Sequence, residues 1–268
     1  MKVKFLFLTV VFAFACTGLL PAQDLINAVK TGKIKKVSRL LPYDNIDEKD
    51  ENNYTAYHWA AILGNQEIAE LLLENGAEPN ALVTDVPFKN AGGGVLIWGG
   101  DIMGAKSAAV LAEENGHSDL VDFFLSKGNI DYDLRAAVMC NNPIVEEKAL
   151  KLGADPDMYV NLGGRKIIVT AAEVALATGS DKCMDILLEN GADISTAFAS
   201  SLIYDRFSQY NKVWEKLLEK GAEINPIFED TNHSQDTLFN IIQHVCHKYG
   251  DYSKTRFLID HGVNVDKK

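Results

Sequence analysis

Residues able to ligate a metal or haem gather near the C-terminus. His244 and His247 are three positions apart, with Cys246 between them, and His261 follows further along the chain. A zinc site needs at least one more converging ligand of this kind. The spacing therefore leaves a metal or haem site open as an alternative, and we predict no cofactor from it.

A second stretch resembles a phosphate-binding loop. Gly99 and Gly104 have the spacing of that loop, and Lys106 and Ser107 follow. In the true motif the lysine directly follows the second glycine. Here Ala105 intervenes, so the lysine and the hydroxyl are out of register. We interpret Ser107 instead as the N-cap of a helix.

The remaining reactive side chains give no catalytic pattern. The pairs Glu113-Glu114 and Glu146-Glu147 are adjacent, and adjacent residues on a helix do not face each other, so we expect solvated carboxylates. No arrangement of nucleophile, base and oxyanion donors is visible, which predicts that the chain is not an enzyme. Cys140, Cys183 and Cys246 fall in apolar helical patterns and are expected to be buried; a Cys140–Cys183 bridge stays open.

A short phrase recurs along the chain and defines the elements that would position these residues. It consists of an apolar pair, two further residues, a glycine and a small residue. Its glycines are Gly76, Gly128, Gly153, Gly191, Gly221 and Gly262, and a degenerate copy spans residues 40–44. A glycine directly after an amphipathic segment is typical of a helix end. Repetition at this period predicts a stacked solenoid with an extended surface.

A second pattern precedes the phrase. Residues 55–65 indicate a short helix with Thr55 as its N-cap, ending at Gly64. Similar stretches begin at Ser107 and Thr170. Each unit is therefore expected to contain a short helix, a tight turn, a second helix and a loop that ends with glycine.

The stretch of residues 55–65, followed by 71–80, resembles the ankyrin repeat, and we suspect the exported bacterial type. The resemblance implies an all-α solenoid of about seven helix-turn-helix repeats between residues 24 and 266, acting by protein binding. The proline that the family has at the start of the first helix of a repeat is replaced by alanine at residues 56, 108 and 171. Val110 and Glu173 stand where the family, like His58 here, has histidine; we expect weaker bracing between units there.

The interval from Gly76 to Gly128 is too long for one repeat. It contains apolar, β-prone runs at residues 82–88 and 95–98 around a glycine-rich segment. We expect these runs to pair, forming an extended β-hairpin-like finger of residues 82–104 in the third repeat, projecting from the concave side.

Partner-binding residues are predicted from the finger and from repeat two. Finger-tip positions and the two residues before the turn glycine tend to face partners in the ankyrin family. The predicted binding residues are Tyr54, Ile62, Leu63, Phe88, Leu96 and Trp98. An alternative is that the finger folds back and covers Ile62 and Leu63.

The first residues suggest export. Two lysines precede an apolar run that ends near Leu20, the pattern of a signal peptide spanning residues 1–22. The alternative is a lipoprotein leader with Cys16 as the lipidated residue. Residues 23–268 would then form the ankyrin-repeat domain, secreted or periplasmic.

The charge limits the classes of partner. The formal net charge of −11 argues against nucleic-acid binding, which needs clustered cations, and against attachment to an anionic bilayer other than by a lipid anchor. We therefore expect a monomeric module that binds an unidentified protein through its concave face and finger. The alternative is a haem- or metal-handling accessory protein for an extracytoplasmic enzyme.

Overall fold

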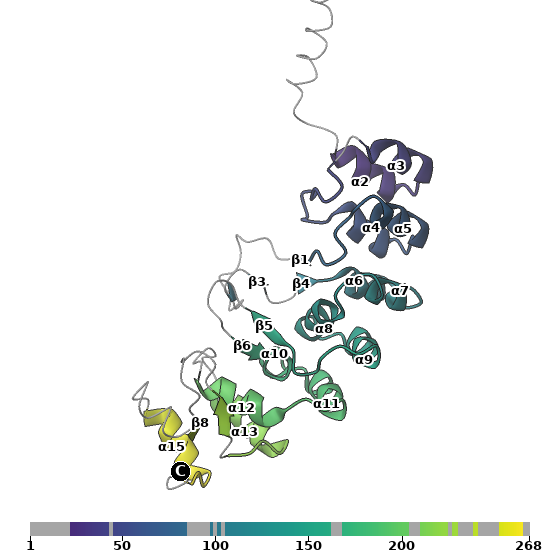
Figure 1. Cartoon of the computed structure of the whole chain (residues 1–268). Coiled ribbons are helices and arrows are strands. Elements are labelled where there is room, and N and C mark those ends of the chain that lie inside the picture. The colour runs from purple at the N-terminus through teal and green to yellow at the C-terminus, as the bar shows by residue number, and fades with distance from the viewer. Residues whose placement is uncertain are drawn as a thin grey trace, which may run out of the picture.

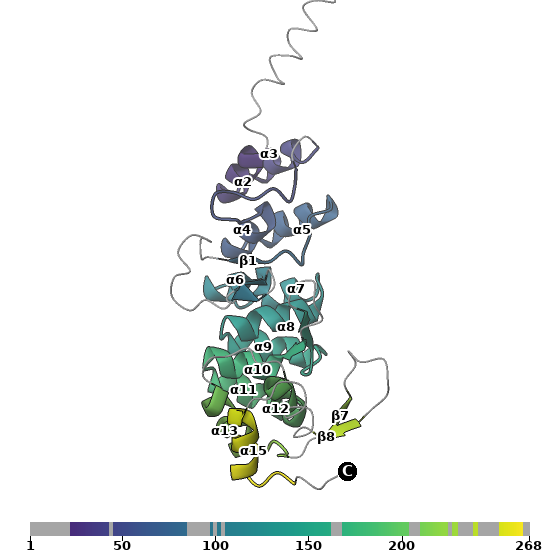
Figure 2. The same ribbon diagram turned by 90° about the vertical axis from the view of Figure 1, so that its left-hand side faces the viewer.

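The computed structural model describes part of the chain. Its described residues are 22–42, 45–84, 97–98, 101–102, 105–161, 168–203, 210–224, 227–229, 238–240 and 252–264. Within them the protein is mostly helical, and successive helix pairs stack into an elongated solenoid (Figures 1 and 2).

The helix pairs follow the predicted sequence of short helix, turn and second helix. They are α2 (Ala22–Lys30) with α3 (Ile34–Leu40), α4 (Ala56–Ile62) with α5 (Gln66–Glu74), α6 (Ala108–Glu114) with α7 (Val121–Leu125), α8 (Ile130–Met139) with α9 (Pro143–Lys151), α10 (Ala171–Thr178) with α11 (Asp181–Glu189), and α12 (Ile194–Ile203) with α13 (Tyr210–Glu219), before α15 (Tyr252–Asp260). The total of about seven repeats stays a prediction.

The three predicted N-caps are confirmed. The side-chain oxygens of Thr55, Ser107 and Thr170 each accept a hydrogen bond from the backbone N–H three residues later. Ser107 is thus a helix cap. Glu173 does more than the sequence suggested: its Oε2 accepts the backbone N–H of Thr170 at 2.9 Å and completes a capping box.

Gly64 shows why the turn within a pair needs glycine. Its φ is +63°, and a Cβ there would lie 2.4 Å from Nδ1 of His117, on the next unit. The same left-handed position in the fourth pair is held by Asn141, with φ of +54°. Asparagine tolerates this region better than most residues, because its short polar side chain can bond locally.

Short two-stranded ladders occur at alternate junctions between pairs. Between α5 and α6 lie β1 (Val83–Thr84), β2 (Ile97–Trp98), β3 (Asp101–Ile102) and β4 (Ala105–Lys106). Between α9 and α10 lie β5 (Tyr159–Asn161) and β6 (Ile168–Thr170), and after α13 come β7 (Ile227–Glu229) and β8 (Leu238–Asn240). By contrast, α7 leads to α8, and α11 to α12, through four residues each. This alternation accounts for the uneven glycine spacing.

The strand pairing expected for the finger does not occur among the described strands. β1 pairs with β4, placing Val83 opposite Lys106, and β2 pairs with β3, placing Trp98 opposite Asp101. Only Gly99 and Gly100 separate β2 from β3, and a two-residue Gly-Gly link favours a local hairpin over a distant partner. Most of residues 82–104 lies outside the described residues, so the extended finger stays a prediction.

The core runs along the stack between the helix layers. Small residues such as Ala60, Ala61 and Ala109 are fully buried and allow neighbouring helices to approach closely. Larger side chains, including Tyr57, Phe198 and Trp214, fill the wider spaces. In the described portion, no helix has the length and apolar character needed to cross a bilayer. The leader, residues 1–22 with Cys16, falls outside the described portion except for Ala22.

Candidate protein-binding surface

Asp50 organises the start of the second unit. Its Oδ2 accepts hydrogen bonds from Nζ of Lys30 at 3.0 Å and from Nε1 of Trp59 at 2.8 Å. Its Oδ1 accepts the backbone N–H groups of Asn52 and Tyr54. Burial would raise the pKa of Asp50, but these bonds together hold its pKa below the ordinary value. The carboxylate therefore ties α2, the loop and α4 into one rigid corner.

Three side chains pack around this corner. Tyr54 meets Trp59 edge to face, with ring centroids 5.5 Å apart, and Nζ of Lys30 lies 4.0 Å from the centroid of the Trp59 ring. Such contacts hold aromatic rings in fixed orientations. Tyr54, a predicted binding residue, is half-buried and braced from within. Its role in binding a partner stays a prediction.

His58 connects this unit to Ala81, just before the segment of residues 82–104. It is fully buried, its Nδ1 lies 2.7 Å from Oγ1 of Thr55, and its Nε2 lies 2.9 Å from the carbonyl oxygen of Ala81. Burial lowers the pKa of His58 to about 4, although the bond to Ala81 opposes this shift. The ring is neutral at physiological pH, so its role is to position the chain.

Ile62 and Leu63 lie at the end of α4. Nε2 of His117, in the next unit, is 3.2 Å from the carbonyl oxygen of Ile62, which fixes this helix end against its neighbour. Ile62 is half-buried, whereas Leu63 is 42% exposed. Leu63 is thus an apolar side chain facing solvent at a helix end that is held in place, and its contact with a partner stays a prediction.

The predicted finger residues are placed only in part. Phe88 and Leu96 lie outside the described residues, and of Trp98 only the backbone, in β2, is described. The structure therefore brings Tyr54, Ile62 and Leu63 onto one unit, and their contact with the finger stays a prediction.

Sequence reasoning overlooked a polar group between the second, third and fourth units. Ser107 donates to the carboxyl group of Asp133 on α8, and burial raises the pKa of Asp133 to about 6 despite this bond. Burial, and secondarily the charge of Asp133, also raises the pKa of the Tyr57 phenol. On the same helix Tyr132 is 44% exposed, with the Arg135 guanidinium 5.4 Å from its ring centroid. In its unit, Asp133 stands at the position that Ala56 holds in the second unit. An acidic residue at this otherwise apolar position was the signal in the sequence that could have indicated a buried polar group.

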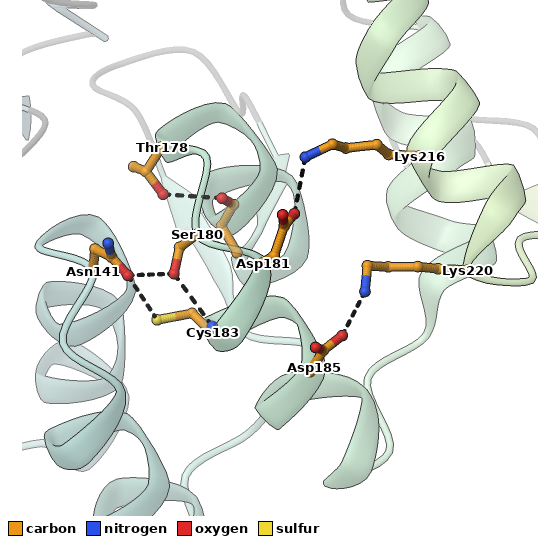
Figure 3. A network of polar contacts seen from close by, with 9 residues as sticks. Asn141, Thr178, Ser180, Asp181, Cys183, Asp185, Lys216 and Lys220 are labelled. Carbon is orange, nitrogen blue, oxygen red and sulfur yellow. Dashed lines mark hydrogen bonds and ion pairs between the residues drawn. The ribbon is translucent and has the colours of Figure 1, made fainter.

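The fourth and fifth units meet through a second polar network (Figure 3). Oδ1 of Asn141 accepts from the hydroxyl of Ser180 and from the thiol of Cys183 at 3.7 Å. Cys140 donates to the carbonyl of Ala105 at 3.5 Å, and neither Cys140 nor Cys183 is in a disulfide, so the two form no bridge. Burial raises the pKa of Cys183 to about 12, which makes its thiol unreactive.

The proposed metal ligands are not assembled by the described residues, which contain no cluster of three His, Cys, Asp or Glu side chains suited to a metal. His244, Cys246 and His247 lie outside that portion of the chain. Nδ1 of His261 lies 2.8 Å from the carbonyl oxygen of Phe257, and its ring stacks on the Phe257 ring at 4.1 Å. His261 thus has a local structural role, and the haem or metal alternative stays a prediction.

This geometry defines a class, the helical repeat scaffold with an extended surface. Residues 22–82 match the family described as ankyrin repeats (3 copies), so this part of the chain is similar to that family. Ankyrin repeats generally mediate protein–protein interaction and are generally non-enzymatic scaffolds.

Three curated relatives match part of the chain. The chain is 33% identical over 123 residues to calmodulin-binding transcription activator 6 of Arabidopsis thaliana, covering 40% of this chain and 13% of the relative. It is 36% identical over 83 residues to activator 5 of the same plant, covering 31% and 8%. It is 38% identical over 61 residues to 26S proteasome non-ATPase regulatory subunit 10 of Dictyostelium discoideum, covering 22% and 26%. The chain thus spans about a quarter or less of each relative.

Proposed function

We propose that this protein binds a protein partner at the corner formed by Tyr54, Ile62 and Leu63, together with the finger of residues 82–104. The observation that carries the proposal is Leu63, which is 42% exposed at the end of a helix that His117 holds in place. An apolar side chain on a rigid support loses little entropy on binding. The finger residues Phe88, Leu96 and Trp98 would add contacts from the adjacent junction.

The proposed setting is outside the cytoplasm. The support is the basic start and apolar run of residues 1–22, with Cys16 as an alternative lipidation site. An exported bacterial protein is proposed on this basis, although the relatives that share its repeats come from eukaryotes. As in the proteasome subunit, the repeat region would serve an assembly, and here its partner would reside in the envelope.

The test compares variants in partner capture from native envelope extract, followed by binding titrations with the protein so identified. Leu63→Arg and Trp98→Ala are each expected to weaken binding by about tenfold or more, because central apolar contacts dominate interface energies. The melting temperature of Leu63→Arg should stay unchanged, since Leu63 is exposed.

The matched control is Leu152→Arg. Leu152 is 55% exposed but follows α9, on the other helix layer and two units away, so its replacement should leave binding intact. Normal binding by both Leu63→Arg and Trp98→Ala would place the interface elsewhere.

A further inference from the structure

The first unit has a charge opposite to that of the whole chain. Residues 30–39 contain five cations and no acidic residue, whereas the formal net charge of the chain is −11. The cations are Lys30, Lys33, Lys35, Lys36 and Arg39. Net charge alone argued against attachment to an anionic surface, but attraction within a Debye length depends on the local cluster.

Most of this cluster is unpaired. Lys30 binds Asp50, but within the described residues Lys33, Lys35, Lys36 and Arg39 form no ion pair. Lys33, Lys35 and Arg39 are exposed, and Lys36 is half-buried. These four side chains are named here the basic face; it lies on α3 and the turn before it, at the N-terminal end of the stack (Figure 1).

The position of α3 explains why its outer side chains are polar, but it does not explain why they are all positively charged. Gly32, with φ of +65°, corresponds to Gly64 in the next unit, so Lys36 takes the place of the fully buried Ile68. A terminal unit of a solenoid needs a polar outer surface for solubility. Carboxylates would meet that need equally well in this acidic chain, so the exclusive use of cations points to an anionic ligand.

An open groove lies beside the basic face. It has a volume of about 730 Å³ between α3 and α5 and is lined by Ile34, Lys35, Ser38, Arg39 and Leu71. Two apolar side chains thus adjoin two cations and a hydroxyl group. This combination suits a phospholipid, whose phosphate needs donors and positive charge and whose acyl chains are apolar.

We propose that the basic face docks this protein on an anionic phospholipid bilayer, with its N-terminal end toward the membrane. The apolar run of the leader lies directly before α2, so a retained or lipidated leader would bring this face to the bilayer. Stable attachment generally takes two signals, such as one lipid chain and a polybasic patch. The rest of the acidic solenoid would be repelled and would stand away from the surface.

A bilayer fits this face better than an acidic peptide does. The exposed carboxylates Glu67, Glu70 and Glu74 lie along α5, which forms the other wall of the groove. They would oppose an acidic helix lying in the groove. A bilayer surface, in contrast, can contact α3 and the mouth of the groove at Leu71 without lying along the length of α5.

The test is co-sedimentation of the full chain with vesicles of equal parts phosphatidylglycerol and phosphatidylcholine, and with pure phosphatidylcholine vesicles. We expect binding to the anionic vesicles that weakens steeply as salt is added. Lys35→Glu combined with Arg39→Glu should reduce the partition coefficient about tenfold or more. The control, Lys49→Glu with Lys182→Glu, makes the same change in net charge at exposed lysines elsewhere and should bind normally.

All variants carry the same leader, so any contribution from it cancels in the comparison. If the double glutamate variant fails to fold by circular dichroism, Lys35→Gln with Arg39→Gln tests the same contacts with a smaller expected loss. Equal binding to both vesicle types, or equal losses in test and control variants, would overturn the proposal. Salt-sensitive binding to poly-L-glutamate without binding to anionic vesicles would also overturn it and would favour an acidic polypeptide.

Discussion

Glu146 is buried in a place where the corresponding units have apolar residues. It lies on α9. The equivalent positions on α5, α7 and α11 are held by Ala69, Val121 and Met184. The residue is fully buried, and in the described structure neither carboxyl oxygen has a hydrogen bond of ordinary geometry. Burial raises the pKa of Glu146 to about 8, and the weak donor Cys183 only partly opposes the rise. The sequence-based expectation of a solvated carboxylate was wrong here, because the apolar positions around it fix which helix face is buried.

The raised pKa gives a definite pH dependence. Between its unfolded value near 4.5 and its folded value of about 8, the folded state binds more protons, so stability falls as pH rises. In the wild type, the free energy of unfolding should fall by on the order of 3 kcal/mol between about pH 5 and pH 8, and we expect Glu146→Gln to abolish this fall. Urea unfolding at several pH values measures this. Asp133, whose pKa is raised to about 6, leaves a smaller slope at lower pH in both proteins.

The neighbouring Glu147 provides the control. It is exposed, and its hydrogen bond and ion pair with Lys151 at 2.6 Å lower its pKa. Glu147→Gln should therefore leave the decline toward alkaline pH intact. Parallel pH profiles for wild type and Glu146→Gln would show that Glu146 does not titrate with folding.

At the scale of elements, local signals were predictable and long-range pairing was not. Thr55, Ser107 and Thr170 mark helix starts because a cap satisfies backbone groups within three residues. The sequence predicted Tyr54, Ile62 and Leu63 as candidate binding residues one by one, without the contacts that hold the corner together. Asp50 contacts Lys30, twenty positions before it, and Trp59, nine positions after it, and no pattern in the sequence predicts these contacts. The pairing of strands between residues 82 and 106 could not be predicted for the same reason, because β1 pairs with β4 and the β2–β3 hairpin lies between them in the sequence.

Outer helices α11 and α13 are joined by two matching ion pairs (Figure 3). Lys216 binds Asp181 at 2.9 Å, and Lys220 binds Asp185. Both pairs link residues 35 positions apart, and the two members on each helix are one turn apart. The regular spacing places two contacts on facing sides, which helps fix how the sixth pair sits on the fifth.

Reversing one side of this ladder should have a modest, salt-dependent effect. Asp181→Lys with Asp185→Lys is expected to lower the melting temperature by roughly 1–3 °C at low salt, because exposed pairs contribute little individually. Adding Lys216→Asp and Lys220→Asp should restore most of the loss. Calorimetry at low and high salt measures both effects. A full swap as unstable as the half swap would show that charge complementarity does not set this register.

For the whole molecule, the stacking arrangement implies that stability is distributed along the chain. In a solenoid each unit contacts mainly its neighbours, so a defect at one end need not unfold the other. The last described helix, α15, is attached by the Phe257 ring, 5.0 Å from the ring of Trp214, and by Lys254, whose Nζ donates to the carbonyl of Leu202 at 3.0 Å. The proposed binding corner at Tyr54 and Leu63 lies in the second unit, toward the opposite end of the stack (Figure 1).

Phe257→Ala should therefore loosen the C-terminal end selectively. Removing a buried phenylalanine costs about 3–5 kcal/mol in a core, and here the loss falls on one terminal contact. Hydrogen exchange followed by mass spectrometry should show faster exchange in α13 and α15 while α4 and α6 keep their protection. Ile259→Ala, in the same helix but 54% exposed, should change neither region. Uniform acceleration along the chain would instead mean that the stack unfolds as one cooperative unit, so that damage at the C-terminal end would also reach the proposed binding corner.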